Sequence, residues 1–166
     1  MNERIGMDIR LASELLLLLL IANGTPVLAG LLLRRRWAYP LDGGRVCRDG
    51  RRLFGASKTV RGLLAALLAT ALLAAALGLP WWYGALFAGL AMSGDTGSSY
   101  LKRRLGYPSS CASPGLDQLP ESLLPLLLLQ RVTATGPAEL AAVTVAFAAI
   151  DLLLSRLLNP AQPRCR

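Results

Sequence analysis

The sequence predicts an all-α integral membrane protein, with five transmembrane helices around a polar cavity that opens to the cytoplasm. Three observations support this fold class. Of the 166 residues, 54% are hydrophobic and only 17% are charged, which is less charge than an average soluble domain carries. The apolar residues fall in blocks rather than stripes, and Leu and Ala, which favour helices, dominate these blocks. The ionisable residues gather between the blocks.

The blocks define five candidate spans within one membrane domain that covers residues 1–166. A helix needs about 20 residues to cross a bilayer core. The first and last blocks meet this length, and the first is too long for a cleaved signal peptide. The third block is short, so its helix must continue into the polar residues that follow, and prolines in the fourth predict a kink. The predicted spans are 12–33, 62–79, 80–100, 117–131 and 137–158, with long cytoplasmic loops at 34–61 and 101–116.

The basic residues predict the orientation in the membrane. The loop at 34–61 has nine basic and two acidic residues, further basic residues follow at 102–104 and at the C-terminus, and the turn at 77–83 is uncharged. The positive-inside rule places the basic segments in the cytoplasm. The N-terminus is therefore expected outside, and the C-terminus and any site in the basic loops are expected inside. Trp81, Trp82 and Tyr83 fit an aromatic belt at the outer interface.

Residues 41–62, LDGGRVCRDGRRLFGASKTVRG, predict a structured loop or lid. Glycines at positive φ can expose backbone N–H groups, and the basic side chains offer donors to phosphate oxygens. Thr59 can cap the next helix, so that Lys58 and the helix N-terminus face one anion. The polyphosphate-binding candidates are Gly43, Gly44, Arg45, Gly55, Lys58, Thr59 and Arg61. Contact with anionic lipid headgroups is the alternative, and it is the role expected of Arg34, Arg35 and Arg36.

A second polar stretch, GDTGSSYLKRRLG at 94–106, follows the third apolar block. If the helix continues through it, four side chains at positions i, i+3, i+4 and i+7 face a common cavity: Asp95, Ser98, Ser99 and Lys102. An aspartate near the membrane is costly unless it is paired, which favours a functional site, and an Asp95–Lys102 salt bridge is the simpler alternative. Gly94 and Gly97 are expected to permit close approach of another backbone.

Asp117 begins the fourth span, and Glu121 follows one helical turn later. Asp95 and Asp117 at one membrane interface suit Mg²⁺, which prefers oxygen ligands and keeps waters and substrate phosphates in its shell. A helix N-cap is the alternative role for Asp117. The chain has no histidine, and Cys47, Cys111 and Cys165 show no CxxC spacing, which argues against zinc and haem.

The first and fifth spans also contain polar residues. Asn23-Gly24-Thr25-Pro26 is expected to break the first helix, with Asn23 and Thr25 lining the cavity, and a plain proline kink is the alternative. Asp151 in the fifth span is expected to snorkel or to pair with Arg156 or another arginine, and it is given no site role.

These polar stretches together resemble the CDP-archaeol synthases, the archaeal CTP-dependent lipid cytidylyltransferases, and more distantly the bacterial phosphatidate cytidylyltransferases. The matching stretches are NGTP at 23–26, LDGGRVCRDGRRLFGASKTVRG at 41–62, GDTGSSYLKRRLG at 94–106 and GLDQLPES at 115–122. The residues that match the metal-site motif of the bacterial relatives are Asp95, Ser98, Lys102, Arg103 and Asp117. The chain departs from that motif at Gln118, where the bacterial family has arginine, and it lacks the bacterial His-Gly-Gly.

The resemblance implies that the phosphate of 2,3-bis-O-geranylgeranylglyceryl phosphate, an unsaturated archaeal ether lipid, attacks the α-phosphorus of CTP. The products are CDP-archaeol and pyrophosphate, and Mg²⁺ is required. It further implies that Asp95 and Asp117 hold the metal and that the loop at 41–55 closes over CTP. Phosphate ligands are then Lys58, Arg61, Lys102 and Arg103, the catalytic residues are Asp95, Asp117, Lys58 and Lys102, and Asn23, Asp42 and Ser98 contact the nucleotide.

The expected partners are therefore CTP, the geranylgeranyl ether lipid phosphate and membrane lipid, not nucleic acid, and the oligomeric state stays open. The proposed chemistry needs in-line positioning and charge neutralisation more than a protein nucleophile. A CTP-dependent polyprenol kinase is one alternative. A non-enzymatic lipid transporter or scaffold is another, but it gives no reason for two aspartates at loop–helix junctions.

Overall fold

The computed structural model describes residues 8–108, 111, 113 and 115–158, and within them five α-helices and no named β-strand are found. The helices are α1 (Ile9–Leu33), α2 (Val60–Ala76), α3 (Trp81–Arg104), α4 (Gln118–Thr133) and α5 (Pro137–Leu158). The all-α prediction is confirmed, and each helix falls within a few residues of a predicted span. Residues 1–7 and 159–166, which include Cys165, lie outside the described residues. Some of their charges entered the orientation prediction.

Two predicted features of the helices are wrong. First, α1 runs without a break through Asn23-Gly24-Thr25-Pro26. Asn23 Nδ2 donates to the carbonyl of Leu19 at 3.1 Å and Thr25 Oγ1 to that of Ile21 at 2.5 Å, so both polar groups bond to the preceding turn of their own helix. Second, α3 continues through the polar stretch as expected but extends to Arg104, so the loop predicted at 101–116 begins too early and residues 101–104 belong to the helix.

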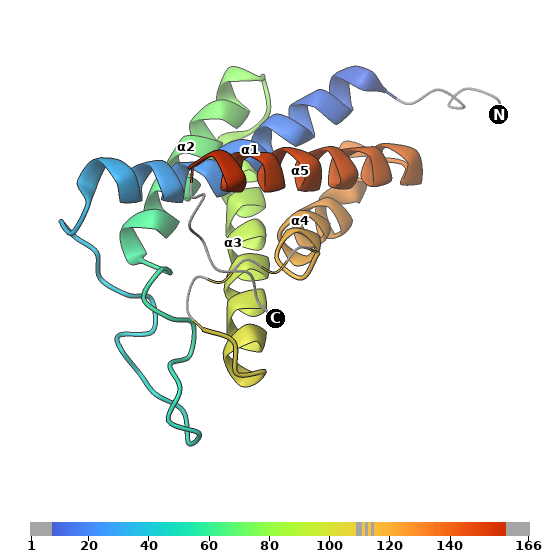
Figure 1. The fold of residues 1–166 in the computed structure, drawn as a ribbon. Coiled ribbons are helices and arrows are strands. Elements are labelled where there is room, and N and C mark those ends of the chain that lie inside the picture. The colour runs from blue at the N-terminus through green and yellow to red at the C-terminus, as the bar shows by residue number, and fades with distance from the viewer. Residues whose placement is uncertain (1–7, 109–110, 112, 114, 159–166) are drawn as a thin grey trace.

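Helix α1 is the centre of the assembly, because it contacts each of the other four helices. In Figure 1, α1 and α5 cross over the long α3, and the loop that follows α1 lies beside the C-terminal end of α3. Helices α2 and α3 pack together and are joined by a short turn at the opposite end of α3. This arrangement collects the long polar loops at one end of the helices.

Helix α2 has large apolar side chains on its outward face and small residues on its inward face. On α2, Leu64, Leu68 and Leu72 are 53%, 66% and 72% exposed, whereas the opposite stripe of Gly62, Ala66, Thr70 and Ala74 is buried. Helices in lipid gain little from hiding leucine and associate through close packing of small residues. Helices α1 and α5 are long and apolar enough to cross a membrane, and α2 is apolar but shorter.

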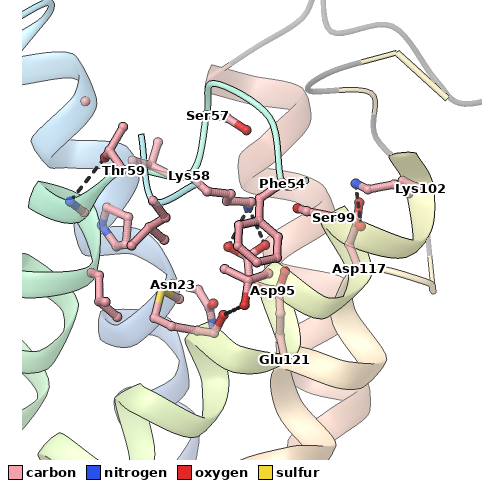
Figure 2. Close-up of a pocket in the computed structure, with 18 of the residues that line it drawn as sticks. Asn23, Phe54, Ser57, Lys58, Thr59, Asp95, Ser99, Lys102, Asp117 and Glu121 are labelled. Carbon is pink, nitrogen blue, oxygen red and sulfur yellow. Dashed lines mark hydrogen bonds and ion pairs between the residues drawn. The ribbon is translucent and has the colours of Figure 1, made fainter. Parts of the chain in front are cut away.

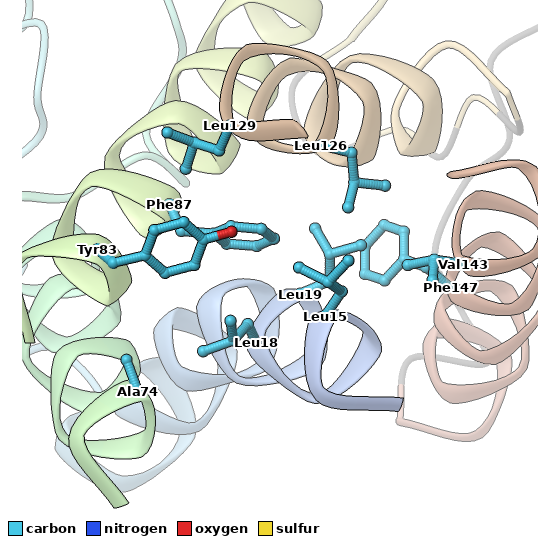
Figure 3. Close-up of a cluster of buried hydrophobic side chains, with 10 residues drawn as sticks. All are labelled: Leu15, Leu18, Leu19, Ala74, Tyr83, Phe87, Leu126, Leu129, Val143 and Phe147. Atoms are coloured by element: carbon cyan, nitrogen blue, oxygen red, sulfur yellow. The ribbon is translucent and has the colours of Figure 1, made fainter. Parts of the chain in front are cut away.

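A cluster of large apolar side chains joins the helices at the end away from the polar loops. Figure 3 shows its ten members, which come from all five helices: Leu15, Leu18, Leu19, Ala74, Tyr83, Phe87, Leu126, Leu129, Val143 and Phe147. The contribution of α1 comes from its first half. The second half of α1 is therefore left to line the polar end of the molecule.

One glycine contact decides how α3 meets α4. A Cβ on Gly94 would lie 2.3 Å from the carbonyl oxygen of Pro120 and 2.8 Å from the backbone nitrogen of Glu121. Only glycine permits this approach, which brings Asp95 close to the first turn of α4. The predicted close approach is thus confirmed for Gly94 and wrong for Gly97, whose Cβ would meet nothing within 4 Å.

Candidate active site

A polar cavity of about 400 Å³ lies where the second half of α1, the start of α2, the end of α3, the start of α4 and the end of α5 come together. This volume lies within the usual range of small-molecule sites, about 300–1,000 Å³. The cavity has both signs of charge, and its ionisable lining residues are Lys58, Asp95, Lys102, Arg103, Asp117, Glu121 and Asp151.

Lys58 and Asp95 form the first ion pair of the cavity. Lys58 Nζ lies 2.5 Å from each carboxylate oxygen of Asp95, and the two side chains are only 21% and 18% exposed. Figure 2 shows Lys58 reaching across the cavity to Asp95, with Glu121 beside it. Burial acts to lower the pKa of Lys58, but the Asp95 carboxylate outweighs it and raises that pKa, so the ammonium group stays charged. Asp95 is therefore already matched with a cation.

Lys102 and Asp117 form the second ion pair, with Lys102 Nζ at 2.7 Å from Asp117 Oδ1. The Asp95–Lys102 salt bridge, which was the simpler alternative, is not found among the described ion pairs. Asp95 pairs with Lys58 instead, and Lys102 pairs with Asp117. Asp117 occupies the N-cap position of α4 but makes no capping hydrogen bond with its side chain. Its Oδ2 instead accepts a hydrogen bond from the backbone N–H of Ser113 at 3.0 Å.

The other predicted site residues divide into two groups. Asn23, Thr59 and Arg103 line the cavity, and Thr59 caps α2 as expected, because its hydroxyl accepts from the Gly62 N–H at 3.3 Å. Ser99 lines the cavity as well, whereas Ser98 does not, and the Ser98 hydroxyl donates to the carbonyl of Asp95 at 2.9 Å. Arg61 lies outside the lining, and its guanidinium donates to the carbonyl of Arg36.

Asp42 organises the glycine-rich loop from the inside. Its side chain is fully buried and accepts hydrogen bonds from the N–H groups of Gly44, Phe54 and Gly55 at 2.9, 3.3 and 3.3 Å, and from Arg52 at 2.9 Å. Burial acts to raise the pKa of this carboxyl, but the hydrogen bonds outweigh it and lower that pKa. The amides of Gly44 and Gly55, which were phosphate-binding candidates, are therefore directed at Asp42.

The first part of this loop forms a separate cavity. Asp42, Gly43 and Arg45 line it, and only Leu41 and Phe54 are shared with the main cavity. The structure thus does not bring these candidates together with Asp95 and Asp117.

Replacing Asp42 with alanine is expected to loosen the loop, because three backbone N–H groups lose their acceptor. Each buried unsatisfied group costs about 1–3 kcal/mol. Tryptic cleavage at the loop arginines of the full-length protein should accelerate at least about tenfold. Val46→Ala is the control, since Val46 lies in the same loop with an exposed side chain. Equal cleavage rates in the two variants would contradict the organising role.

The loop docks against the end of α3. Arg104 Nη1 lies 2.7 Å from Asp49 Oδ2, and Arg51 Nη1 donates to the carbonyl of Arg103 at 3.2 Å. Carbonyl groups in the last turn of a helix have no partner in that helix and attract cations. Because Lys102 lies in the same turn, the docking fixes the loop relative to the cavity. Cys47 in this loop is a free cysteine, so it forms no disulfide with Cys111.

Sequence reasoning missed several lining residues. Glu121 and Gln118 are buried in the first turn of α4, Phe54 lies at the cavity from the loop, and Asp151 reaches it from α5. No ion pair between Asp151 and Arg156 is found among the described residues. The available signal was the presence of ionisable residues within apolar spans, which by default marks a functional site.

The carboxylates fit a magnesium ion that also binds substrate. Mg²⁺ usually takes one or two protein carboxylates together with waters and substrate phosphates. Asp95 and Asp117 present such groups to one cavity, and each already faces a cation. Among the described residues, no group of three or more acidic, histidine or cysteine side chains is close enough to hold a metal alone. A metal in this cavity would therefore need phosphate oxygens to complete its shell.

The helical bundle is apolar outside and encloses paired aspartates and lysines, which is typical of a membrane protein with a polar site, and it is similar to a solved structure. It is described as "an intramembrane enzyme for archaeal membrane lipids biosynthesis", with a TM-score of 0.67, 37% identity, and coverage of 90% of this chain and 93% of that one.

Curated relatives identify the family. The CDP-archaeol synthase of Hyperthermus butylicus is 39% identical over 89% of this chain and 86% of that protein. The CDP-archaeol synthase of Methanopyrus kandleri is 39% identical over 72% of each. No family model matches the chain. The chain belongs to the CDP-archaeol synthase family, as the sequence resemblance predicted.

Proposed function

We propose that this protein transfers the cytidylyl group of CTP to the phosphate of 2,3-bis-O-geranylgeranylglyceryl phosphate, giving CDP-archaeol and pyrophosphate. The observation that carries the proposal is the double pairing of Lys58 with Asp95 and Lys102 with Asp117 in one cavity at the polar end of the bundle. A site of this kind can bind a polyphosphate and a metal together. The family, whose named members are CDP-archaeol synthases, supports the same reaction.

In the reaction, an anionic oxygen of the lipid phosphate attacks the α-phosphorus of CTP. A new P–O bond forms, the bond from the α-phosphorus to the α,β-bridging oxygen breaks, and pyrophosphate leaves with that electron pair. The nucleophile is already ionised, so the protein needs no general base. Its task is to align the two anions and to offset their charge.

Asp95 and Asp117 are the residues that would hold Mg²⁺, which supplies positive charge to the nucleotide phosphates. If a divalent cation neutralised these aspartates, Lys58 and Lys102 would be available for the substrates. Lys58, Lys102 and Arg103 would then bind phosphate oxygens, since all three line the cavity. This exchange would keep Asp95, Asp117 and the two lysines paired with opposite charges before and after substrate binding, which avoids the large cost of an unpaired buried charge.

The nucleotide would bind under the loop. The N-terminus of α2, capped by Thr59, faces the cavity and favours an anion through the positive end of the helix dipole. Asn23 offers an amide from α1, and the 41–55 loop covers CTP on the side of Phe54. Because Asp42, Gly43 and Arg45 line the adjacent cavity, we assign them to the shape and closure of the loop.

We further propose that all five helices span the membrane, with the N-terminus outside and the C-terminus and the site in the cytoplasm. The outward leucines of α2 and the small residues within the bundle support embedding in lipid. The basic loop and the basic end of α3 contact each other, so they lie on one side. The positive-inside rule makes that side cytoplasmic.

Product analysis tests the function. Membranes that contain the protein are incubated with Mg²⁺, the geranylgeranyl lipid phosphate and CTP labelled at the α-phosphorus. Label is expected to enter the lipid fraction with one pyrophosphate released per labelled lipid. A CTP-dependent polyprenol kinase would transfer the γ-phosphoryl group instead. Label recovered only as free CDP, with none in lipid, would therefore exclude cytidylyl transfer, and a transporter would leave CTP intact.

A further inference from the structure

One hydrogen-bonded link between α4 and α5 lies inside the cavity and has no role in the reaction as described above. Gln118, the first residue of α4, donates from Nε2 to Asp151 Oδ2 at 2.8 Å. Its Oε1 accepts a hydrogen bond from the backbone N–H of Gly115, also at 2.8 Å. Gln118 is only 4% exposed, and both Gln118 and Asp151 line the cavity.

The chemistry of the two partners fixes which way the Gln118 amide points. A glutamine side chain donates from one end and accepts at the other, whereas an ionised carboxylate only accepts and a backbone N–H only donates. The reverse orientation would set the amide oxygen against the Asp151 carboxylate and the NH₂ group against the Gly115 N–H. Asp151 therefore selects the orientation in which Gln118 can hold Gly115.

Gly115 belongs to the turn that carries Asp117. The turn is closed by the N–H of Asp117, which donates to the Ser113 carbonyl at 3.2 Å, and by the Ser113 N–H, which donates to Asp117 Oδ2 at 3.0 Å. Gly115 has φ +87°, a conformation that L side chains rarely adopt. The direction of the Asp117 carboxylate thus depends on a turn whose middle is held by Gln118.

We propose that Asp151 on α5 is a positioning residue for Asp117, which it orients through the Gln118 amide and the Gly115 turn. Asp151 itself touches no reacting atom. The proposal rests on the proposed function in one respect, because it takes Asp117 to be a ligand of the magnesium ion. It gives the part of α5 that lines the cavity a specific task, because Asp151 reaches Gln118 on α4.

A cycle of four full-length proteins tests the link: wild type, Asp151→Asn, Gln118→Glu and the double variant. The measurement is Mn²⁺ affinity, read by electron paramagnetic resonance in the presence of CTP, together with the melting temperature in detergent. Asp151→Asn should stay within about twofold of wild type, because an asparagine oxygen still accepts from Gln118 Nε2. Gln118→Glu should weaken Mn²⁺ binding about tenfold, because two carboxylates then face each other.

The double variant separates positioning from a general structural role. Its new amide at position 151 donates to the new carboxylate at position 118, so Mn²⁺ affinity should return to within about threefold of wild type. A double variant that melts like wild type but binds Mn²⁺ no better than Gln118→Glu would overturn the proposal. Loss of affinity in Asp151→Asn as large as in Gln118→Glu would overturn it as well, because the charge rather than the hydrogen bond would then matter.

Two further variants keep this inference distinct from the proposed function. Asp151→Leu removes the acceptor and should weaken Mn²⁺ binding, whereas Glu139→Leu makes the same change on α5 near its N-terminus and should not. Wild-type affinity in Asp151→Leu would refute the positioning role alone. Wild-type affinity in Asp117→Asn would instead refute the proposed metal site, whatever the cycle shows.

Discussion

Replacing Asp95 or Asp117 with asparagine is expected to lower kcat/KM for cytidylyl transfer more than about 100-fold, because each change removes a carboxylate that would hold the metal. An amide keeps the size of the side chain but carries no charge, so it neither binds Mg²⁺ well nor balances a lysine. The measurement is incorporation of α-labelled CTP into lipid at saturating Mg²⁺. Both aspartates should show the loss, since each stands in its own ion pair within the same cavity.

Folding must be checked, because Asp95→Asn leaves the ammonium of Lys58 buried without its partner. The double variant Asp95→Asn with Lys58→Gln removes both charges and should melt like wild type while it stays inactive. Glu139→Gln, a neutralised carboxylate at the start of α5 and outside the cavity, should keep full activity. Substantial turnover in folded Asp95→Asn or Asp117→Asn protein would remove these residues from the chemistry.

Gly94→Ala is expected to destabilise the protein by about 1–3 kcal/mol or more, which is the usual cost of forcing extra atoms into a tight contact. The added Cβ would meet backbone atoms of Pro120 and Glu121, and a backbone cannot rotate away as a side chain can. Helices α3 and α4 must therefore separate, which also moves Asp95 from its place beside Glu121. The melting temperature in detergent and the labelled-lipid assay should fall together.

Gly97→Ala is the matched control, because it makes the same change one turn further along α3. Its Cβ would point into open space, and alanine favours a helix over glycine by about 1 kcal/mol. This variant should melt at or above the temperature of wild type and keep its activity. If both alanine variants behaved alike, close packing at Gly94 would not be what joins the two helices.

The helices could be predicted from local sequence because their signals are local. Leucine-rich and alanine-rich blocks form helices wherever they occur, and Thr59 caps α2 from its own position. The continuation of α3 through its polar residues followed from the short apolar block before them. The break at Asn23 to Pro26 was wrong for an equally local reason, since asparagine and threonine side chains can bond to the preceding turn of an intact helix.

Partner choice, in contrast, needed the tertiary structure. Helical spacing placed Asp95 and Lys102 on one face, two turns apart, and left a salt bridge between them as the simpler alternative to a functional site. The loop instead brings Lys58 over Asp95, and the turn before α4 brings Asp117 to Lys102. No spacing rule relates these residues, because the chain folds back between them. The same holds for Asp42, whose candidate role as a nucleotide contact gave no sign of its bonds to the loop amides.

By itself, the sequence determined that the chain is an all-α membrane protein of this family, with two aspartates and a set of lysines and arginines near one face. Composition and short motifs are enough for that, because hydrophobicity and family resemblance are properties of residues in order. Only the tertiary structure decided which charges pair, that Gly94 closes α3 onto α4, and that Asp151 reaches Gln118. Those facts depend on distances between helices. Packing determines these distances, and no local sequence pattern predicts them.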